Sequence, residues 1–395
     1  MAIISIAKFL LVLCGLAVLL TNRSGETNEF LAGKHTPIAV LVTIFLLTLS
    51  FTWTVAPPFE ALASLVKHGK LILIVLVMML IRSRYEAAIV LATFGLSQAF
   101  LLLSSWMLFV QLPVPWATSQ MALKEYAVFS SYLDQGIISA VFAAVCWHLR
   151  QFIPGRWGPR FAIFLSLIAL ANVFFILSGR SGHIVAIFLL SLAIMWELPK
   201  RHRLIIIFLP FILAVGLFFS SSKVNDRVTL LQNEVQSYST DPQTNTSSGV
   251  RLRFWITSLH AIRQHPFMGT GVGSWTNEYN RLQRGNNPSH KDVEKNGNPH
   301  QEYLLWGVQL GIPGIMLIVF MMVAIFRDSK KMDESIARAT QSTLLALTIA
   351  CFFNASIYDA QIGDFFCILL GLLLAFGLNK TFDSALYPLK QKQSF

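Results

Sequence analysis

Residues 161–198 read FAIFLSLIALANVFFILSGRSGHIVAIFLLSLAIMWEL, and this stretch decides the fold class. Two continuously apolar runs, Phe161–Leu177 and Ile184–Leu198, lie on either side of one short polar turn. Runs close to 20 residues long match the thickness of the hydrocarbon core of a bilayer, roughly 30 Å. A backbone surrounded by lipid must satisfy its own hydrogen bonds, so such runs form helices. The stretch therefore predicts two membrane-spanning helices joined by a turn that carries Arg180.

The same kind of apolar run recurs along almost the whole chain. The composition agrees, because 54% of the 395 residues are hydrophobic and only 13% are charged, against about 25% charged in soluble domains. We therefore predict an all-α polytopic membrane protein. Eleven segments are visible: Ala2–Leu20, Pro37–Ala56, about Leu71–Ile81, Ala87–Val110, Ile137–Trp147, Phe161–Leu177, Ile184–Leu198, Leu204–Ser220, Tyr303–Phe326, Ser342–Ile357 and Phe365–Leu378.

The net charge of +11 does not indicate binding to nucleic acid. Lysine and arginine gather in short loops, at 149–160, 199–203 and 327–338, and in the tail from Lys380 to Lys392. This is the distribution of cytoplasmic loops under the positive-inside rule. Because short spans alternate sides, Arg180 and residues 223–302 are expected to emerge on the outer face.

Charged residues break the apolar pattern in the first third of the chain. Lys67, His68 and Lys70 interrupt what would otherwise be one apolar run from Phe59 to Ile81. A lysine at mid-membrane costs roughly 2.5–3.5 kcal/mol on insertion scales. These residues are therefore expected at an interface or on a broken helix. Ala2–Leu20 is expected to be a retained anchor, because it lacks a small-residue cleavage site.

The spans divide the chain into three parts. Residues 1–222 form an N-terminal transmembrane bundle, residues 223–302 a large outer loop, and residues 303–395 the last helices with a short cytoplasmic tail. Loops of such length are uncommon without a function of their own. The loop is therefore expected to be folded, partly helical, and the place where chemistry occurs.

Two local patterns organise this loop. Residues Arg251–His265 have the apolar spacing of an amphipathic helix, in Leu252, Trp255, Ile256, Leu259 and Ile262. Ser247 and Ser248 are candidate N-cap residues. The glycines at 269, 271 and 273 then end the helix and predict a turn before Trp275.

His300 is the candidate general base. Asn298 and Pro299 stand where an N-cap and a first helical residue are favoured, directly before the apolar run from Tyr303. His300 is thus expected in the first turn of a membrane-entering helix, at the positive end of the helix dipole. This position favours neutral imidazole, the form that a general base requires. A polar residue at the membrane interface would look the same.

Three arginines are candidates for binding an anion. Arg180 lies among small residues between two spans, while Arg251 and Arg253 lie in the loop. Arginine matches phosphate oxygens with two parallel hydrogen bonds. A snorkelling side chain at the membrane edge explains Arg180 equally well, and solvated loop charges explain the other two. Together with a neutral base, the three arginines would suit a lipid-pyrophosphate substrate.

The sequence implies neither a metal ion nor a nucleotide cofactor. It contains no His-Glu-x-x-His motif and no phosphate-binding P-loop. The four cysteines all lie within apolar spans, so no cysteine metal site or disulfide framework is indicated.

Four segments together resemble the O-antigen ligase and polymerase group of bacterial membrane glycosyltransferases. They occur in the same order as in that family: Leu177-Ser178-Gly179-Arg180; Arg251-Leu252-Arg253-Phe254-Trp255 with His265-Pro266-Phe267-Met268-Gly269-Thr270-Gly271; Pro299-His300-Gln301-Glu302-Tyr303-Leu304; and Asn354-Ala355-Ser356-Ile357-Tyr358-Asp359. The chain departs from the family pattern at Gln301, where the family usually has asparagine. The resemblance covers roughly residues 110–380.

The resemblance implies about twelve transmembrane helices in a fold related to C-type glycosyltransferases. It also implies metal-independent, inverting transfer of a glycan from undecaprenyl pyrophosphate to an acceptor hydroxyl at the periplasmic face of the bacterial inner membrane. The site residues then have the following expected roles: His300 as base, Arg180 and Arg251 on the pyrophosphate with Arg253 as a secondary candidate, Asp359 orienting His300 or the acceptor, and Asn298 and Tyr303 in support.

Several members of this group remain possible. A ligase with lipid A–core as acceptor fits the chain length and the large loop best. The alternatives are a polymerase and a protein O-oligosaccharyltransferase. A transporter or flippase of lipid-linked sugars is an alternative of another class, but it would need ionisable residues along a membrane pathway.

Overall fold

The structure is a computed structural model. It describes residues 31–117, 120–128, 131–199, 208–222, 246–286 and 297–379, together with residues 13, 201, 225–226, 229–230, 232–234 and 236. The expected anchor Ala2–Leu20 and the basic tail from Lys380 therefore lie outside the described residues, apart from Leu13.

The predicted all-α polytopic class is confirmed. Within the described residues, eight helices are long and apolar enough to cross a membrane. These are α3 with η1 (His35–Leu49, Ser50–Thr52), α4 with α5 (Pro58–Gly69, Ile72–Leu80), α6 (Arg84–Phe109), α9 with η3 (Gly158–Ala171, Asn172–Ile176), α10 (Arg180–Glu197), α16 (Ile312–Ser329), α17 (Glu334–Phe353) and α18 (Ala360–Leu378).

The remaining helices are shorter or less apolar. They are α7 (Gln120–Glu125), α8 (Tyr132–His148), η2 (Arg150–Phe152), α11 (Leu209–Ser220), α13 (Ser247–Gln264), α14 (Trp275–Asn286) and α15 (Glu302–Leu310). Helices α8 and α11 correspond to two of the predicted spans.

The span predicted near Leu71–Ile81 is longer than expected. Helices α4 and α5 together form one run of 23 residues, Pro58–Leu80, with a single break at Lys70 and Leu71. The lysine at the break is held by another part of the protein. Lys70 Nζ donates to the carbonyl oxygens of Tyr358 (3.2 Å) and Asp359 (2.6 Å). The cost of the charge is thus offset by polar backbone of the α17–α18 connection.

The span predicted as Tyr303–Phe326 is two helices, not one. It breaks at Gly311, whose φ of +71° is in the left-handed region that glycine adopts without steric cost. The next amide, Ile312 N, leaves the helical pattern and donates to Pro266 O at 2.7 Å. A Cβ on Gly311 would lie 2.4 Å from the same oxygen. Helix α15 is therefore a short buried helix, and only α16 has the length of a span.

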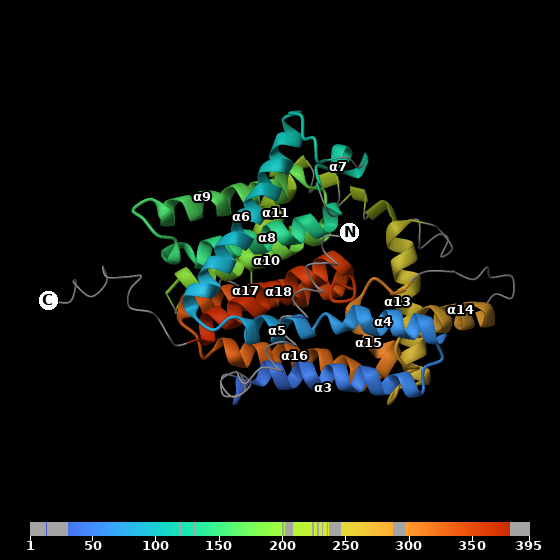
Figure 1. The fold of residues 1–395 in the computed structure, drawn as a ribbon. Coiled ribbons are helices and arrows are strands. Elements are labelled where there is room, and N and C mark those ends of the chain that lie inside the picture. The colour runs from blue at the N-terminus through green and yellow to red at the C-terminus, as the bar shows by residue number, and fades with distance from the viewer. Residues whose placement is uncertain are drawn as a thin grey trace.

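The helices form a bundle with two different ends. Figure 1 shows α3, α5, α16, α17 and α18 running side by side, with α13 crossing one end of the bundle at a steep angle. At the opposite end, Asp328 of α16 accepts hydrogen bonds from Thr36 N (2.7 Å) and Thr36 Oγ1 (2.8 Å). Arg84 forms an ion pair there with Asp333. The predicted basic loop at 327–338 thus lies at the end away from α13.

The predicted loop helix is confirmed as α13, although its cap and its buried face differ from expectation. Thr246, not Ser247 or Ser248, is the N-cap and accepts a hydrogen bond from Gly249 N. The helix buries Phe254, Thr257, Ser258, Ala261 and Ile262, while Leu252, Ile256 and Leu259 are exposed. The apolar spacing found in the sequence therefore marks mostly the outer face of this helix.

The glycine turn after α13 joins three parts of the chain. Thr270 N and Gly271 N donate to Val308 O and Gln309 O of α15, both at 2.9 Å. Thr270 O accepts from Val55 N, between α3 and α4, at 3.0 Å. Gly271 has a φ of +89°, and a Cβ there would lie 2.2 Å from Thr54 Cα, so the close approach requires glycine.

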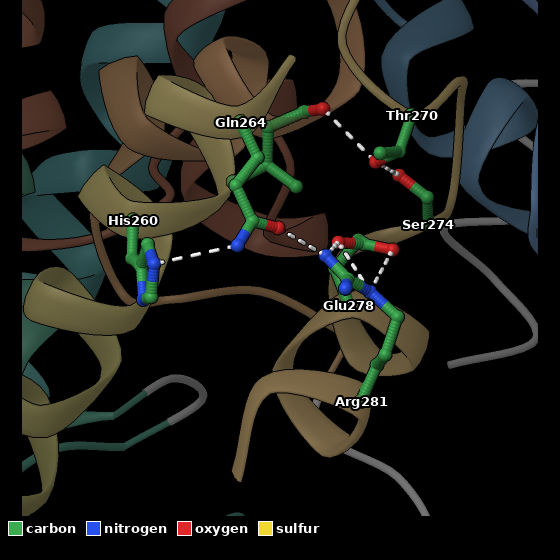
Figure 2. Close-up of polar contacts among 7 residues, drawn as sticks. His260, Gln264, Thr270, Ser274, Glu278 and Arg281 are labelled. Atoms are coloured by element: carbon green, nitrogen blue, oxygen red, sulfur yellow. Dashed lines mark hydrogen bonds and ion pairs between the residues drawn. The ribbon is translucent and has the colours of Figure 1, made fainter. Parts of the chain in front are cut away.

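A polar brace fixes α14 against α13 and the turn. Figure 2 shows Arg281 paired with Glu278 of its own helix and donating to Gln264 at the end of α13. The figure also shows the hydroxyl groups of Thr270 and Ser274 bonded to each other, 2.7 Å apart. The start of α14, the turn and α15 are thereby held as one unit beside the end of the bundle.

Candidate functional site

The structure places His300 before a helix and not in its first turn. Helix α15 begins at Glu302, and its cap is Gln301, whose Oε1 accepts from Leu304 N at 2.5 Å. Asn298 Oδ1 instead accepts from His300 N at 2.8 Å. Asparagine side chains often accept from the amide two residues later in this way, and such a local turn competes with the role of a helix cap. The first-turn prediction was therefore wrong, and His300 has a φ of +52°.

The imidazole of His300 is oriented by a chain of amide groups. Its Nδ1 lies 3.1 Å from Asn354 Oδ1. Asn354 Nδ2 donates to Asp359 Oδ2 at 2.8 Å, and Asn298 Nδ2 donates to Asp359 Oδ1 at 3.3 Å. The ring also stacks on Phe254 of α13, with centroids 6.3 Å apart and planes 20° apart. His300 and Asp359 are thus linked through Asn354 and Asn298, without direct contact.

This chain of contacts assigns the tautomer of His300. A carboxylate only accepts hydrogen bonds, so the NH₂ group of Asn354 must face Asp359. The Oδ1 atom of Asn354 then faces the imidazole, and Nδ1 must carry the proton that it donates. The lone pair of the neutral ring is left at Nε2. Among the described residues, no hydrogen-bond partner lies at that nitrogen, and the side chain is half-buried.

Glu302 fixes the position of the segment that orients His300. Its carboxylate is fully buried. Oε2 accepts from Ile357 N (2.8 Å) and Tyr358 N (3.1 Å), in the α17–α18 connection, and Oε1 accepts from Trp306 Nε1 (2.7 Å). The carboxylate therefore ties the start of α15 to the connection that carries Asn354 and Asp359.

Arg180 and Arg251 form a second cluster, with Glu234 and Ser248. Arg180 Nη2 donates to Glu234 Oε2 at 3.0 Å, and Nη1 donates to Ser248 Oγ at 3.2 Å. Ser248 Oγ also donates to Glu234. Arg251 lies close enough to interact electrostatically with Arg180, Glu234 and Tyr132.

The pKa of Glu234 reflects these surroundings. Burial acts to raise the pKa of the carboxyl, but the hydrogen bonds from Ser248 and Arg180 outweigh it and leave the pKa below its ordinary value. The ionised carboxylate is therefore the form that this cluster favours. Two guanidinium groups and a hydroxyl converge on one anion, a combination that also suits phosphate oxygens.

Arg253 lies apart from this cluster. Residues two positions apart on a helix point about 200° apart, so Arg251 and Arg253 face opposite sides of α13. Arg253 contacts Tyr279 of α14 by a hydrogen bond. Arg251 and Phe254 are three residues apart and share a face. The stacking of Phe254 on His300 therefore puts His300 on the same side of α13 as Arg251.

The remaining predicted site residues have structural contacts. Tyr303 OH donates to Thr348 O at 3.1 Å, and its ring packs against Phe352, so Tyr303 joins α15 to α17. Asn298 contacts both His300 N and Asp359. Among the described residues, no group of three His, Cys, Asp or Glu side chains is arranged to hold a metal ion.

Comparison with known proteins gives one family match. A family model described as O-antigen ligase matches residues 164–319. Over these residues, the chain is similar to the O-antigen ligase family. Members of this family are glycosyltransferase-like enzymes that act in a membrane on lipid-linked polysaccharide. The matched part includes Arg180, Arg251, Arg253 and His300, whereas Asn354 and Asp359 lie beyond it. No curated protein matches the chain.

We predict that Glu302→Gln destabilises the protein. Both carboxylate oxygens of Glu302 accept hydrogen bonds, whereas the glutamine side chain has only one oxygen. At least one buried N–H group would therefore face the NH₂ group of the glutamine. Leaving a buried donor unsatisfied costs about 1–3 kcal/mol. The midpoint of thermal unfolding of the purified protein in detergent should fall, while Glu60→Gln, at an exposed position of α4, should leave it unchanged. An unchanged midpoint for Glu302→Gln would contradict the assigned role.

Proposed function

We propose that this protein is an O-antigen ligase that transfers a glycan from undecaprenyl pyrophosphate to a sugar hydroxyl of lipid A–core. The observation that carries the proposal is the arrangement at the end of the bundle. An imidazole with its Nε2 lone pair available lies on the same side of α13 as a cluster of two arginines. A base beside an anion site is what displacement of a pyrophosphate by a hydroxyl requires.

His300 acts as the general base in this mechanism. Nε2 takes the proton of the acceptor hydroxyl as the hydroxyl oxygen attacks the anomeric carbon of the donor sugar. The bond from that carbon to the pyrophosphate oxygen breaks, and the bonding pair leaves with the pyrophosphate. Displacement in one step inverts the anomeric centre. The carboxylate of Asp359, acting through Asn354 and Asn298, favours the imidazolium ion that forms.

Arg180 and Arg251 hold the pyrophosphate as negative charge builds on it. The phosphate oxygens take the place of the Glu234 carboxylate, which accepts from Arg180 in the present structure. Arg253, on the other face of α13 beside Tyr279, is assigned no direct role in this step.

The site is proposed to face the periplasm of a bacterial inner membrane. The predicted positive-inside loop at 327–338 lies at the end of the bundle away from α13. Lipid-linked sugar donors carry their activation in the pyrophosphate, so the reaction needs no nucleotide on that side of the membrane.

A polymerase of the same family would share this chemistry, with a lipid-linked glycan as acceptor. Deletion of the gene separates the two. Loss of a ligase leaves polymerised glycan on undecaprenyl pyrophosphate, whereas loss of a polymerase leaves single repeat units on lipid A–core. A transporter of lipid-linked sugars would form no new glycosidic bond with purified donor and acceptor.

We predict that His300→Ala abolishes transfer. Loss of a general base lowers the rate by about 10²–10⁴-fold. The measurement is glycan transfer by the purified protein, and the lipopolysaccharide ladder of cells that make normal amounts of the variant. His260→Ala is the matched control, because His260 lies on the exposed side of α13 and contacts Gln264. A normal ladder in His300→Ala cells would rule out the assignment.

We predict that Arg251→Ala and Arg253→Ala differ, although the residues are two positions apart. Loss of a charge-assisted hydrogen bond worth about 1.5–3 kcal/mol reduces the stabilisation of the transition state and lowers the rate by about 10- to 100-fold. Arg251→Ala should therefore lower kcat/KM for the lipid-linked donor by that factor, whereas Arg253→Ala should have a smaller effect. Equal losses for the two variants would contradict the division between the two faces of α13.

A further inference from the structure

Lys67 places a charge in the middle of a membrane-length helix. It is the tenth of the 23 residues of the run Pro58–Leu80 and is exposed. A lysine at mid-membrane costs roughly 2.5–3.5 kcal/mol when it faces lipid. Charges in such positions therefore face a polar cavity or a binding partner, and they mark functional sites by default.

The side chain of Lys67 turns towards the residues around His300. Its Nζ atom lies over the ring of Tyr358, 4.3 Å from the centroid. A Cβ on Gly297 would lie 3.7 Å from the same nitrogen. Lys67 therefore borders the loop segment that leads from Gly297 through Asn298 to His300. Lys67 and Asp359 also interact electrostatically. The ammonium group is thus beside the catalytic segment and not directed into lipid.

Lys67 belongs to a different group of charges from the two arginines. The charges that act on Asp359 are those of His300, Lys70 and Lys67. The groups that act on Arg251 are Arg180, Tyr132 and Glu234. Neither set includes a cation of the other.

Lys67 and Lys70, which both act on Asp359, differ in whether their ammonium groups can contact a ligand. Lys70 is buried, with its Nζ donating to the carbonyl oxygens of Tyr358 and Asp359. Lys67 is exposed, and its cation–π contact with Tyr358 uses one side of the ammonium group. The ammonium group of Lys67 therefore has N–H donors that can bind an incoming anionic group close to the segment that carries His300.

We propose that Lys67 binds a phosphate group carried by the acceptor glycan, and so helps to select the acceptor. The inference rests on the proposed function, because it assumes that two substrates meet at His300. The arginine cluster supplies the site for the pyrophosphate of the donor. A separate cation close to the segment that carries the base then suits an acceptor that carries its own negative charge.

The test uses the full-length protein in nanodiscs with Lys67→Met, which keeps the apolar stem but removes the charge, and Lys67→Arg, which keeps the charge. Removing a charge from a membrane-length helix lowers the cost of insertion, so the methionine variant should fold. Arg160→Ala is the control, since Arg160 makes a comparable contact with Trp157 at the start of α9. Transfer is measured with donor and acceptor varied separately.

The expected result is a rise of roughly 10- to 100-fold in KM for lipid A–core in Lys67→Met, with the donor KM unchanged and with Lys67→Arg close to wild type. Enzymatic removal of phosphate from the acceptor should raise the wild-type KM and abolish the difference between the wild type and Lys67→Met. A raised donor KM would assign Lys67 to the pyrophosphate and overturn the proposal, as would unchanged values for both substrates.

A binding measurement separates this proposal from the proposed function. Phosphorylated and dephosphorylated lipid A–core oligosaccharides are titrated onto the same nanodiscs without donor. If wild-type protein binds the phosphorylated form more tightly and Lys67→Met does not, the anion site stands even if no transfer is found. Equal binding of both forms by the wild type would overturn the proposal while leaving the His300 mechanism intact.

Discussion

The buried carboxylate of Glu302 holds together segments of the chain that are far apart in sequence. It accepts three hydrogen bonds, two from the backbone of the α17–α18 connection and one from Trp306 within its own helix. His300 lies two residues before Glu302, and Asn354 and Asp359 flank the backbone that donates to it. The geometry of the base therefore depends on a residue that has no proposed part in proton transfer. A buried charge of this kind is tolerated because its oxygens have partners.

The same end of the bundle brings in the glycine turn and α13. Gly271 allows the turn to approach Thr54, and its amide donates to Gln309 O near the end of α15. Helix α13 then crosses the end of the bundle (Figure 1) and presents Arg251 and Phe254 on one face. The two groups of cations come from different elements: the arginines from α10 and α13, and the lysines from the α4–α5 run. In the proposed mechanism, each group binds a different charged substrate.

Much of the fold could be predicted from the sequence, because membrane-length apolar runs have only one backbone solution in lipid. The helix at 247–264 and the turn after it followed from periodicity and from glycine. The break at Gly311 was missed, because the apolar run continues through it and the partner of Ile312 N is Pro266, far away in sequence. The prediction of Asn298 as a helix cap was also wrong. Asparagine forms a local turn as readily as a helix cap, and only the surrounding contacts decide between the two.

The site itself was only partly accessible from the sequence. The residue types and their sequence neighbours identified His300, Arg180 and Arg251 as candidates. The sequence did not show which of them lie together in the fold. Arg251 and Arg253 look equivalent in the sequence, and the helical geometry of α13 separates them. Asn354 lay in a segment that resembles the family, yet its role as the link between His300 and Asp359 depends on tertiary contacts. Glu234 gave no signal, because nothing in its local sequence indicates that it pairs with Arg180.

In the proposed mechanism, the two arginines bind the donor pyrophosphate beside a base whose lone pair is at Nε2. Cryo-electron microscopy of the full-length protein in nanodiscs, with an undecaprenyl pyrophosphate-linked glycan bound, tests it most directly. We expect phosphate density in contact with Arg180 and Arg251, with Glu234 displaced and the first sugar next to His300. Pyrophosphate bound elsewhere, with Glu234 still paired to Arg180, would contradict it.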